Sequence, residues 1–366
     1  MKLNINQSEL NNALTVVAKG SSNRSTLTIL AGVYLKAEES KLILQTTNLE
    51  LSIKMEVPAL VEEPGEAVVP AKLIQDIVKN LPDMAVRIET SDDTSLSILC
   101  DTTSFSLRAL NPLDFPAFPE IQTDQEALFP FKTFASMVKQ TAKVVSHDET
   151  HAILTGVLIT QENNTLKMVA TDSYRLAVAE AELNSASESG FEAVISGSFL
   201  QTIASLVPSD EFISLALNEN QIIITYNNTT FINRRLEGTF PNYKQLIGNE
   251  YSTKVVLPTQ HVIDAVRRVS LLSTKVSPIQ LFVDTDANTV TFASHSQDVG
   301  NAQETLSGTI EGESVDIAFN YNFVLDGLNS ITSDTVEINF FGAMKPGILR
   351  STNEESFLYL IMPVRV

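Results

Sequence analysis

The stretch that decides the fold occurs more than once in this chain: ILAGVYLKAEESKLILQTTNLEL (29–51) aligns without a gap with ILTGVLITQENNTLKMVATDSYRL (153–176). In this alignment Gly32 meets Gly156, and the offset between the two copies is 124 residues. A third copy, IQLFVDTDANTVTFASHS (279–296), follows at the same offset. Few residues are identical, but the apolar positions and the polar turns keep their register. Self-similarity at a fixed offset indicates a chain built from copies of one structural unit.

Two helices accompany each copy, because apolar residues recur three or four positions apart in the flanking stretches. The helices are expected within 8–19, 70–82, 132–145, 196–208, 259–272 and 320–331. Their buried faces are expected to carry Leu10, Leu14, Val17, Leu73, Ile77, Leu81, Phe134, Val138, Thr141, Val145, Leu200, Ile203, Val207, Val262, Val266, Val269, Val324, Leu328 and Ile331. Thr259 is a plausible N-cap, and Pro82 and Pro208 mark two helix ends.

Short alternating segments rich in β-branched residues lie between the helices, and this pattern is typical of antiparallel strands. Examples are 51–57, 84–90, 212–218 and 221–227. A proline-dense linker, 109–124, and a second linker, 246–254, separate the copies. The sequence therefore predicts three α+β domains, each with two helices packed on antiparallel sheets. Their expected bounds are 1–120, 121–249 and 250–366.

Composition restricts the function. The net charge of the 366 residues is −19, from 25 basic and 44 acidic side chains, which argues against tight non-specific binding to nucleic acid or to an anionic membrane. No apolar run approaches the roughly 18 residues that span a bilayer, and residues 1–20 lack the pattern of a signal peptide. The single cysteine, Cys100, excludes an internal disulfide and fits a buried thiol in a reducing cytoplasm. We expect a cytoplasmic protein.

Catalytic motifs are scarce. SHDETH (146–151) places His147 and His151 four residues apart, which on a helix would put both imidazoles on one face, as a zinc site requires. Asp148, however, holds the position at which an H-E-x-x-H protease has glutamate. A metal-dependent hydrolase using these histidines is one alternative, and a repeat scaffold without any role on DNA is another. No glycine-rich phosphate loop occurs. We expect neither catalysis nor a cofactor.

Three stretches are unusual: ATDSYRLAV (170–178), EGTFPNYKQLI (237–247) and the terminus FLYLIMPVRV (357–366). The first can be interpreted as a turn closed by Asp172 with Arg175 as a surface charge. Pro363 suggests that the last strand is an edge strand, because proline cannot donate to a central ladder. Apolar Leu360, Met362 and Val364 at that edge suggest a groove for a peptide.

These stretches, together with FNYNFVLDGLNSI (319–331) and the three-fold repeat, resemble the bacterial DNA polymerase III β subunit family, the sliding clamps. The resemblance extends over essentially the whole chain. It implies a head-to-tail homodimer whose six domains form a ring around duplex DNA, independent of DNA sequence. Such a ring would tether the replicative polymerase, would be opened by a separate clamp loader, and would recruit other proteins that carry short clamp-binding peptides.

The resemblance also implies site residues. A hydrophobic peptide groove between the second and third domains would comprise Leu154, Thr171, Ser173, Tyr174, Arg175, Leu176, Pro241, Leu246, Asn320, Phe323, Met344, Pro346, Leu360, Met362, Pro363, Val364 and Arg365. Basic residues lining the hole would contact DNA, and the candidates are Arg24, Lys72, Lys79, Lys139, Lys143, His147, Arg267 and Arg268. The candidates for the dimer interface are Phe105, Leu271 and Leu272.

Overall fold

The computed structural model describes every residue except 23–25, 93, 120–124, 184–189, 207–209, 219, 249, 274–277, 297, 353–355 and 366. Two compact units make up the chain. The first consists of Met1–Phe134 and Ser205–Arg235, and the second of Ala135–Ala204 and Leu236–Val366. No helix in the described part of the chain is long and apolar enough to cross a membrane.

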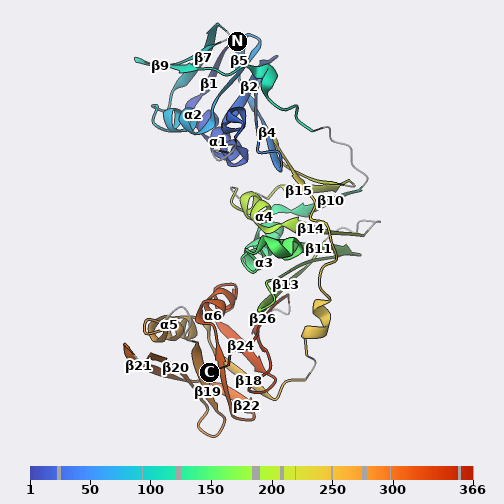
Figure 1. Cartoon of the computed structure of the whole chain (residues 1–366), viewed down its shortest axis with the longest axis vertical. Helices are drawn as coiled ribbons and strands as arrows, with labels where there is room; N and C mark the ends of the chain where they lie inside the picture. The colour runs from blue at the N-terminus through green and yellow to red at the C-terminus, as the bar shows by residue number, and fades with distance from the viewer. Residues whose placement is uncertain are drawn as a thin grey trace. The chain divides into compact units, whose positions relative to one another are not determined.

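The first unit contains two antiparallel sheets. In the order of pairing, the five-stranded sheet comprises β5 (Leu60–Glu63), β1 (Lys2–Asn6), β7 (Ala85–Asp92), β8 (Ser95–Cys100) and β9 (Thr103–Arg108). The eight-stranded sheet comprises β10 (Gln125–Pro130), β15 (Phe212–Leu217), β16 (Gln221–Tyr226), β17 (Thr229–Arg234), β4 (Leu51–Pro58), β3 (Lys41–Thr47), β2 (Gly32–Glu38) and β6 (Gly65–Pro70). Helices α1 (Gln7–Val17) and α2 (Ala71–Lys79) lie side by side (Figure 1).

The second unit also contains two antiparallel sheets. In the order of pairing, the nine-stranded sheet comprises β14 (Phe191–Ser196), β11 (Gly156–Glu162), β12 (Thr165–Thr171), β13 (Arg175–Glu182), β26 (Phe357–Ile361), β25 (Gly347–Ser351), β24 (Thr335–Phe340), β18 (Thr253–Pro258) and β22 (Thr309–Gly312). The four-stranded sheet comprises β21 (Gly300–Ser307), β20 (Thr289–Ser296), β19 (Ile279–Asp284) and β23 (Val315–Phe319). The helices are α4 (Gly197–Ala204), α5 (Thr259–Ser270) and α6 (Tyr321–Leu328), and α3 (Phe131–Thr141) continues into this unit from the first.

The expected helices form, and nearly all of their predicted core residues are buried. Leu73 is the exception, at 47% exposure, because α2 turns Ala71, Ile74, Ile77 and Val78 inward instead. Val207 and Pro208 lie outside the described residues.

The predicted N-cap of α5 is wrong. Pro258 occupies the cap position, and Thr259 is the first helical residue. The hydroxyl of Thr259 donates to the carbonyl of Ser333 at 2.8 Å, so it is not free to cap its own helix. Cys100 is buried, as predicted.

The internal repeat recurs in the backbone at the offset seen in the sequence. Leu49 and Ser173, 124 residues apart, both adopt left-handed conformations, with φ of 75° and 76°. The same holds for Glu39 and Asn163, with φ of 50° and 53°. Such conformations are uncommon for residues other than glycine. Their recurrence at one offset indicates that the same turns are built twice.

Candidate functional site

An apolar cluster covers part of one face of the nine-stranded sheet, from β14 to β25. Its buried members are Leu158, Val169, Leu176, Val178, Val194, Tyr243, Ile348, Leu358 and Leu360. Side chains from the segment 236–247 pack on it, among them Phe240 and Ile247. We call this face of the sheet the linker face. Because successive residues of a strand point to opposite faces, every second residue of β13 and β26 belongs to it.

The C-terminal strand is internal rather than an edge strand. β26 lies between β13 and β25, so the edge predicted from Pro363 is wrong. The strand ends at Ile361, two residues before Pro363, and the missing N–H of the proline therefore costs no ladder hydrogen bond. The chain beyond the strand is nevertheless held. The N–H of Met362 donates to the carbonyl of Tyr174 at 2.8 Å, and that of Val364 donates to Ala318 at 2.9 Å.

The turn before β13 is closed by its own side chains. Asp172 Oδ1 accepts hydrogen bonds from the N–H groups of Tyr174 and Arg175, each at 3.0 Å. The hydroxyl of Thr171 accepts from the N–H of Ser173 and donates to the carbonyl of Arg175 at 2.7 Å. This turn leaves the side chain of Tyr174 65% exposed. An aromatic side chain beside an apolar cluster is a suitable contact for a peptide.

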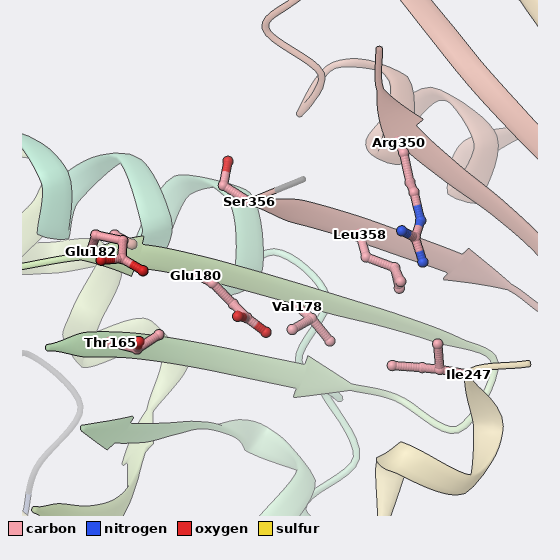
Figure 2. A pocket seen from close by; sticks show the side chains of 9 residues that line it. Thr165, Val178, Glu180, Glu182, Ile247, Arg350, Ser356 and Leu358 are labelled. Atoms are coloured by element: carbon pink, nitrogen blue, oxygen red, sulfur yellow. The ribbon is translucent and has the colours of Figure 1, made fainter. Parts of the chain in front are cut away.

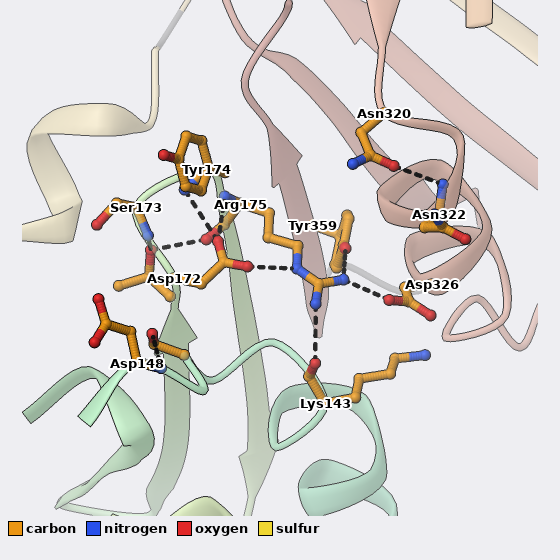
Figure 3. Close-up of polar contacts among 12 residues, drawn as sticks. Lys143, Asp148, Asp172, Ser173, Tyr174, Arg175, Asn320, Asn322, Asp326 and Tyr359 are labelled. Atoms are coloured by element: carbon orange, nitrogen blue, oxygen red, sulfur yellow. Dashed lines mark hydrogen bonds and ion pairs between the residues drawn. The ribbon is translucent and has the colours of Figure 1, made fainter. Parts of the chain in front are cut away.

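Arg175 is not the surface charge that one interpretation of the sequence proposed, because only 8% of it is exposed. Its Nε donates to Asp172 Oδ2 at 2.9 Å, and one terminal nitrogen donates to Asp326 and, at 3.2 Å, to the hydroxyl of Tyr359 (Figure 3). The other terminal nitrogen donates to the carbonyl of Lys143 at 3.1 Å. The guanidinium also lies 4.3 Å from the ring centroid of Phe323. One side chain therefore joins the turn to α6 and β26.

Burial and charge interactions shift the pKa values around this guanidinium. Burial alone would lower the pKa of Arg175, but Tyr359, Asp326 and Asp172 outweigh it and raise that pKa further above its already high value. Burial raises the pKa of the Tyr359 hydroxyl. Burial lowers the pKa of Lys143; the charge of Asp326 opposes this shift, and the charge of Arg175 adds to it. At neutral pH Arg175 is thus a fixed cation and Tyr359 remains protonated.

The predicted groove residues differ in how exposed they are. The exposed residues are Ser173, Tyr174, Pro241, Leu246, Met344, Met362, Val364 and Arg365; the half-buried ones are Asn320, Phe323, Pro346 and Pro363; and the buried ones are Leu154, Thr171, Arg175, Leu176 and Leu360. Leu176 and Leu360 face each other across β13 and β26. Sequence reasoning missed Asp326 and Tyr359, although both bind Arg175.

The basic candidates for DNA contact differ in their availability. Arg24 lies outside the described residues. Lys72, Lys79, Lys139, His147 and Arg267 are exposed, whereas Lys143 is half-buried. Arg268 forms a two-pronged ion pair with Glu304, at 2.8 and 2.6 Å, so part of its charge is already engaged.

The candidates for the dimer interface lie at accessible positions. Phe105 belongs to β9, an edge strand of the five-stranded sheet, and is 36% exposed. Leu271, directly after α5, is 81% exposed, and Leu272 is half-buried. An exposed edge strand presents unpaired N–H and C=O groups that can pair with another chain.

The two histidines of the hydrolase alternative do not share a helix face. His147 precedes a short 3-10 helix, Glu149–Thr155, and His151 interrupts that helix with φ −116° and ψ 63°. Within the described residues, no three His, Cys, Asp or Glu side chains lie close enough together to hold a metal ion.

Comparisons with known proteins agree over the full chain. Family models of the N-terminal, central and C-terminal domains of the DNA polymerase III beta subunit match residues 1–119, 129–242 and 244–365. A beta sliding clamp of Synechocystis is 33% identical, with all of both chains covered. A sliding clamp of Bacillus subtilis has a TM-score of 0.95 at 29% identity and covers 100% of this chain and 99% of its own. A sliding clamp of Pseudomonas aeruginosa bound to griselimycin has a TM-score of 0.94 at 25% identity, with full coverage of both chains. The predicted fold of three clamp domains is confirmed.

Proposed function

The chain belongs to the DNA polymerase III β-subunit family, the bacterial sliding clamps, and we propose that two copies of it close head to tail into a ring around duplex DNA. The family consists of non-catalytic processivity factors of DNA polymerase III. Membership confirms the expectation of a non-enzymatic protein, and it contradicts both the hydrolase and the scaffold without a role on DNA. Three domains per copy would give a ring of six.

Charge supports a ring that holds DNA by topology rather than by affinity. A net charge of −19 disfavours tight contact with phosphates. Lys72, Lys79, Lys139 and Arg267 are exposed and, among the described residues, have no ion-pair partner. We assign them weak, sequence-independent contacts with the DNA backbone, together with the less available Lys143, His147 and Arg268. Arg24 belongs to the same proposal on its sequence position alone.

The edge strand β9 and the exposed Leu271 support the proposed dimer. Phe105 on one copy would face Leu271 and Leu272 on the other, since a head-to-tail pair joins the first domain of one chain to the third of its partner. A closed two-fold ring uses both such surfaces and leaves none free for further assembly. We propose domain bounds near 120 and 249, and a cytoplasmic location.

The observation that best supports a peptide groove is the set of contacts by which Arg175 joins the turn before β13 to α6 and β26. It fixes the exposed Tyr174 beside Met362, with the apolar pair Leu176 and Leu360 behind them. Apolar pockets with a few oriented polar groups are typical of peptide sites. The Pseudomonas relative bound to griselimycin supports a ligand site on this fold. We propose that replication proteins, including the polymerase and a clamp loader, bind here through short peptides.

Retention on DNA tests the ring. Purified protein, loaded by a clamp loader from a related bacterium, should stay on nicked circular DNA through gel filtration and should be lost when the circle is cut once. Leu271→Asp should abolish retention by separating the dimer, and the exposed Leu113→Asp, a matched leucine-to-aspartate change, should not. Equal retention on circular and linear DNA would refute encirclement.

Removal of the tail tests the groove. A labelled Gln-Leu-aliphatic-Leu-Phe peptide should bind the intact chain with micromolar affinity, about −8 kcal/mol. A chain ending at Ile361 keeps β26 but lacks Met362, Val364 and their two backbone hydrogen bonds. It should lose at least about tenfold in affinity. Equal binding by both chains would contradict the groove.

A further inference from the structure

A cavity of about 500 Å³ lies on the linker face, beyond the proposed groove. It is lined by Thr165, Val178, Glu180, Ala181, Glu182, Ile247, Arg350, Ser356 and Leu358 (Figure 2). None of these residues belongs to the groove described above. The volume lies in the range of small-ligand pockets and is sufficient for one or two amino-acid side chains.

The cavity continues the groove along the strands. Val178 and Leu358 are paired across β13 and β26, and each is the next side chain on the linker face after Leu176 and Leu360. Positions two residues apart in a strand are separated by about 7 Å. Ile247 of the cavity directly follows Leu246 of the groove. A peptide longer than the groove can therefore reach the cavity within a few residues.

Arg350 is the cation of this cavity, and its side chain reaches toward Leu358 and Ile247 (Figure 2). Its Nε is buried and has no hydrogen-bond partner within the described chain. The cross-strand neighbour Glu337 does not supply one, because its carboxylate is taken by Lys254 at 2.8 Å and by Asn339 at 2.7 Å. A buried donor without a partner is costly, and such groups are rare in folded proteins. An acceptor that enters the cavity would remove this cost once the Arg350 side chain turns its buried Nε toward it.

The other end of the cavity is acidic, which limits what can occupy it. Glu180 forms an ion pair with Lys167 at 2.9 Å, and Glu182 is exposed. Figure 2 shows Arg350 at one end and Glu182 at the opposite end, with Val178 and Leu358 between them. Two carboxylates repel a polyanion such as nucleic acid but leave room for a single acidic side chain at the Arg350 end. The apolar floor favours a peptide over a small inorganic anion.

We propose that this cavity is an accessory subsite that binds one acidic side chain of a partner peptide, with its carboxylate on Arg350 and an adjacent apolar residue on Val178 and Leu358. The proposal rests on the proposed groove, which holds the core of the same peptide. Partners that carry a glutamate or aspartate beside their core motif would thereby bind more tightly than partners that do not.

Fluorescence anisotropy with synthetic peptides tests the subsite. The core peptide Gln-Leu-aliphatic-Leu-Phe is compared with versions extended by four residues, on either side, that contain one Glu, one Gln or one Lys. The proteins are the full chain, Arg350→Gln, Arg350→Glu and, as a control for the loss of one positive charge elsewhere, the exposed Arg234→Gln. Thermal unfolding and binding of the core peptide establish that each variant is folded.

On the unaltered chain and on Arg234→Gln, the Glu extension should bind about fivefold to tenfold more tightly than the Gln extension. The difference should vanish in Arg350→Gln, and Arg350→Glu should prefer the Lys extension, while affinity for the core peptide stays constant. Equal binding of the Glu and Gln extensions to the unaltered chain would overturn the subsite and leave the groove intact. Failure of the core peptide to bind would overturn both.

Discussion

Replacement of Arg175 by glutamine should destabilise the second unit strongly, although this residue was expected at a binding surface. The change removes the hydrogen bonds to Asp172, Asp326, Tyr359 and the carbonyl of Lys143. It leaves the Asp172 carboxylate, whose side chain is 14% exposed, without its cation. Breaking a buried ion pair typically costs about 3–5 kcal/mol. Because the Asp326 side chain is 41% exposed, we expect a smaller loss, about 2–4 kcal/mol.

Arg268→Gln is the matched control. Arg268 also binds a carboxylate through two nitrogens, but its side chain is 59% exposed. Exposed ion pairs contribute about 0–1 kcal/mol, so this variant should unfold close to the unaltered chain. Arg175→Lys should not rescue the fold, because an ammonium group cannot reproduce the planar fork that reaches four partners on four separate segments.

Urea unfolding followed by circular dichroism measures the difference, and hydrogen exchange locates it. Amides of β13, β26 and α6 should exchange faster in Arg175→Gln than in Arg268→Gln. Binding of the core peptide should fall in parallel, since Tyr174 and Met362 lose their fixed positions. Equal unfolding midpoints for Arg175→Gln and Arg268→Gln would refute the structural role, and loss of peptide binding at unchanged stability would make Arg175 a direct peptide ligand instead.

Two further predictions concern the same unit. A Cβ at Gly327 would lie 2.5 Å from Tyr359 Cδ1 and 2.7 Å from Leu349 Cδ1. Gly327→Ala should therefore lower the free energy of unfolding by about 1–3 kcal/mol, although alanine is the better helix former. A raised melting temperature would contradict this packing argument. Burial alone would raise the pKa of Glu337, but Lys254, Asn339 and, to a smaller extent, the charge of Arg350 outweigh it and hold that pKa below its ordinary value. The stabilisation by Glu337 is therefore present above the unfolded-state pKa and is lost as pH falls through the lowered one. In urea titrations Glu337→Gln should be about 1 kcal/mol less stable than the unaltered chain at pH 7 and nearly as stable at pH 3. The same difference at both pH values would exclude the Glu337–Lys254 ion pair as the cause.

The sequence predicted local features of the fold better than long-range ones. The period of Val262, Val266 and Val269 identified the buried face of α5 because helix geometry alone determines it. The turn at Asp172 was predictable because its hydrogen bonds span only two or three residues. The burial of Arg175 was not predictable, because its partner Asp326 lies 151 residues away.

The wrong predictions likewise concern features that the local sequence does not determine. Pro363 would indicate an edge strand only if it were part of the strand, but the strand ends at Ile361. Leu73 has the spacing of a core residue, but the neighbouring elements determine which side of a short helix is covered. The Arg350 cavity had no sequence signal at all, since it is built from residues of five separate segments: β12, β13, the stretch around Ile247, β25, and β26 with the residue before it.

The turn that occurs in both copies, at Asn48 and at Asp172, shows which features come from the common backbone and which come from individual side chains. Asn48 Oδ1 accepts from the N–H groups of Glu50 and Leu51, as Asp172 Oδ1 accepts from those of Tyr174 and Arg175. Both turns introduce a strand that pairs with a strand from much later in the chain, β4 with β17 and β13 with β26.

Only the second copy, however, has arginine where the first has Leu51, and tyrosine where the first has Glu50. A leucine at that position cannot join the turn to a helix by hydrogen bonds, and a glutamate cannot supply an apolar wall. The common backbone therefore accounts for the continuous sheets of the clamp fold. The Arg175 and Tyr174 side chains account for the placement of the proposed peptide groove at the second of these two equivalent positions.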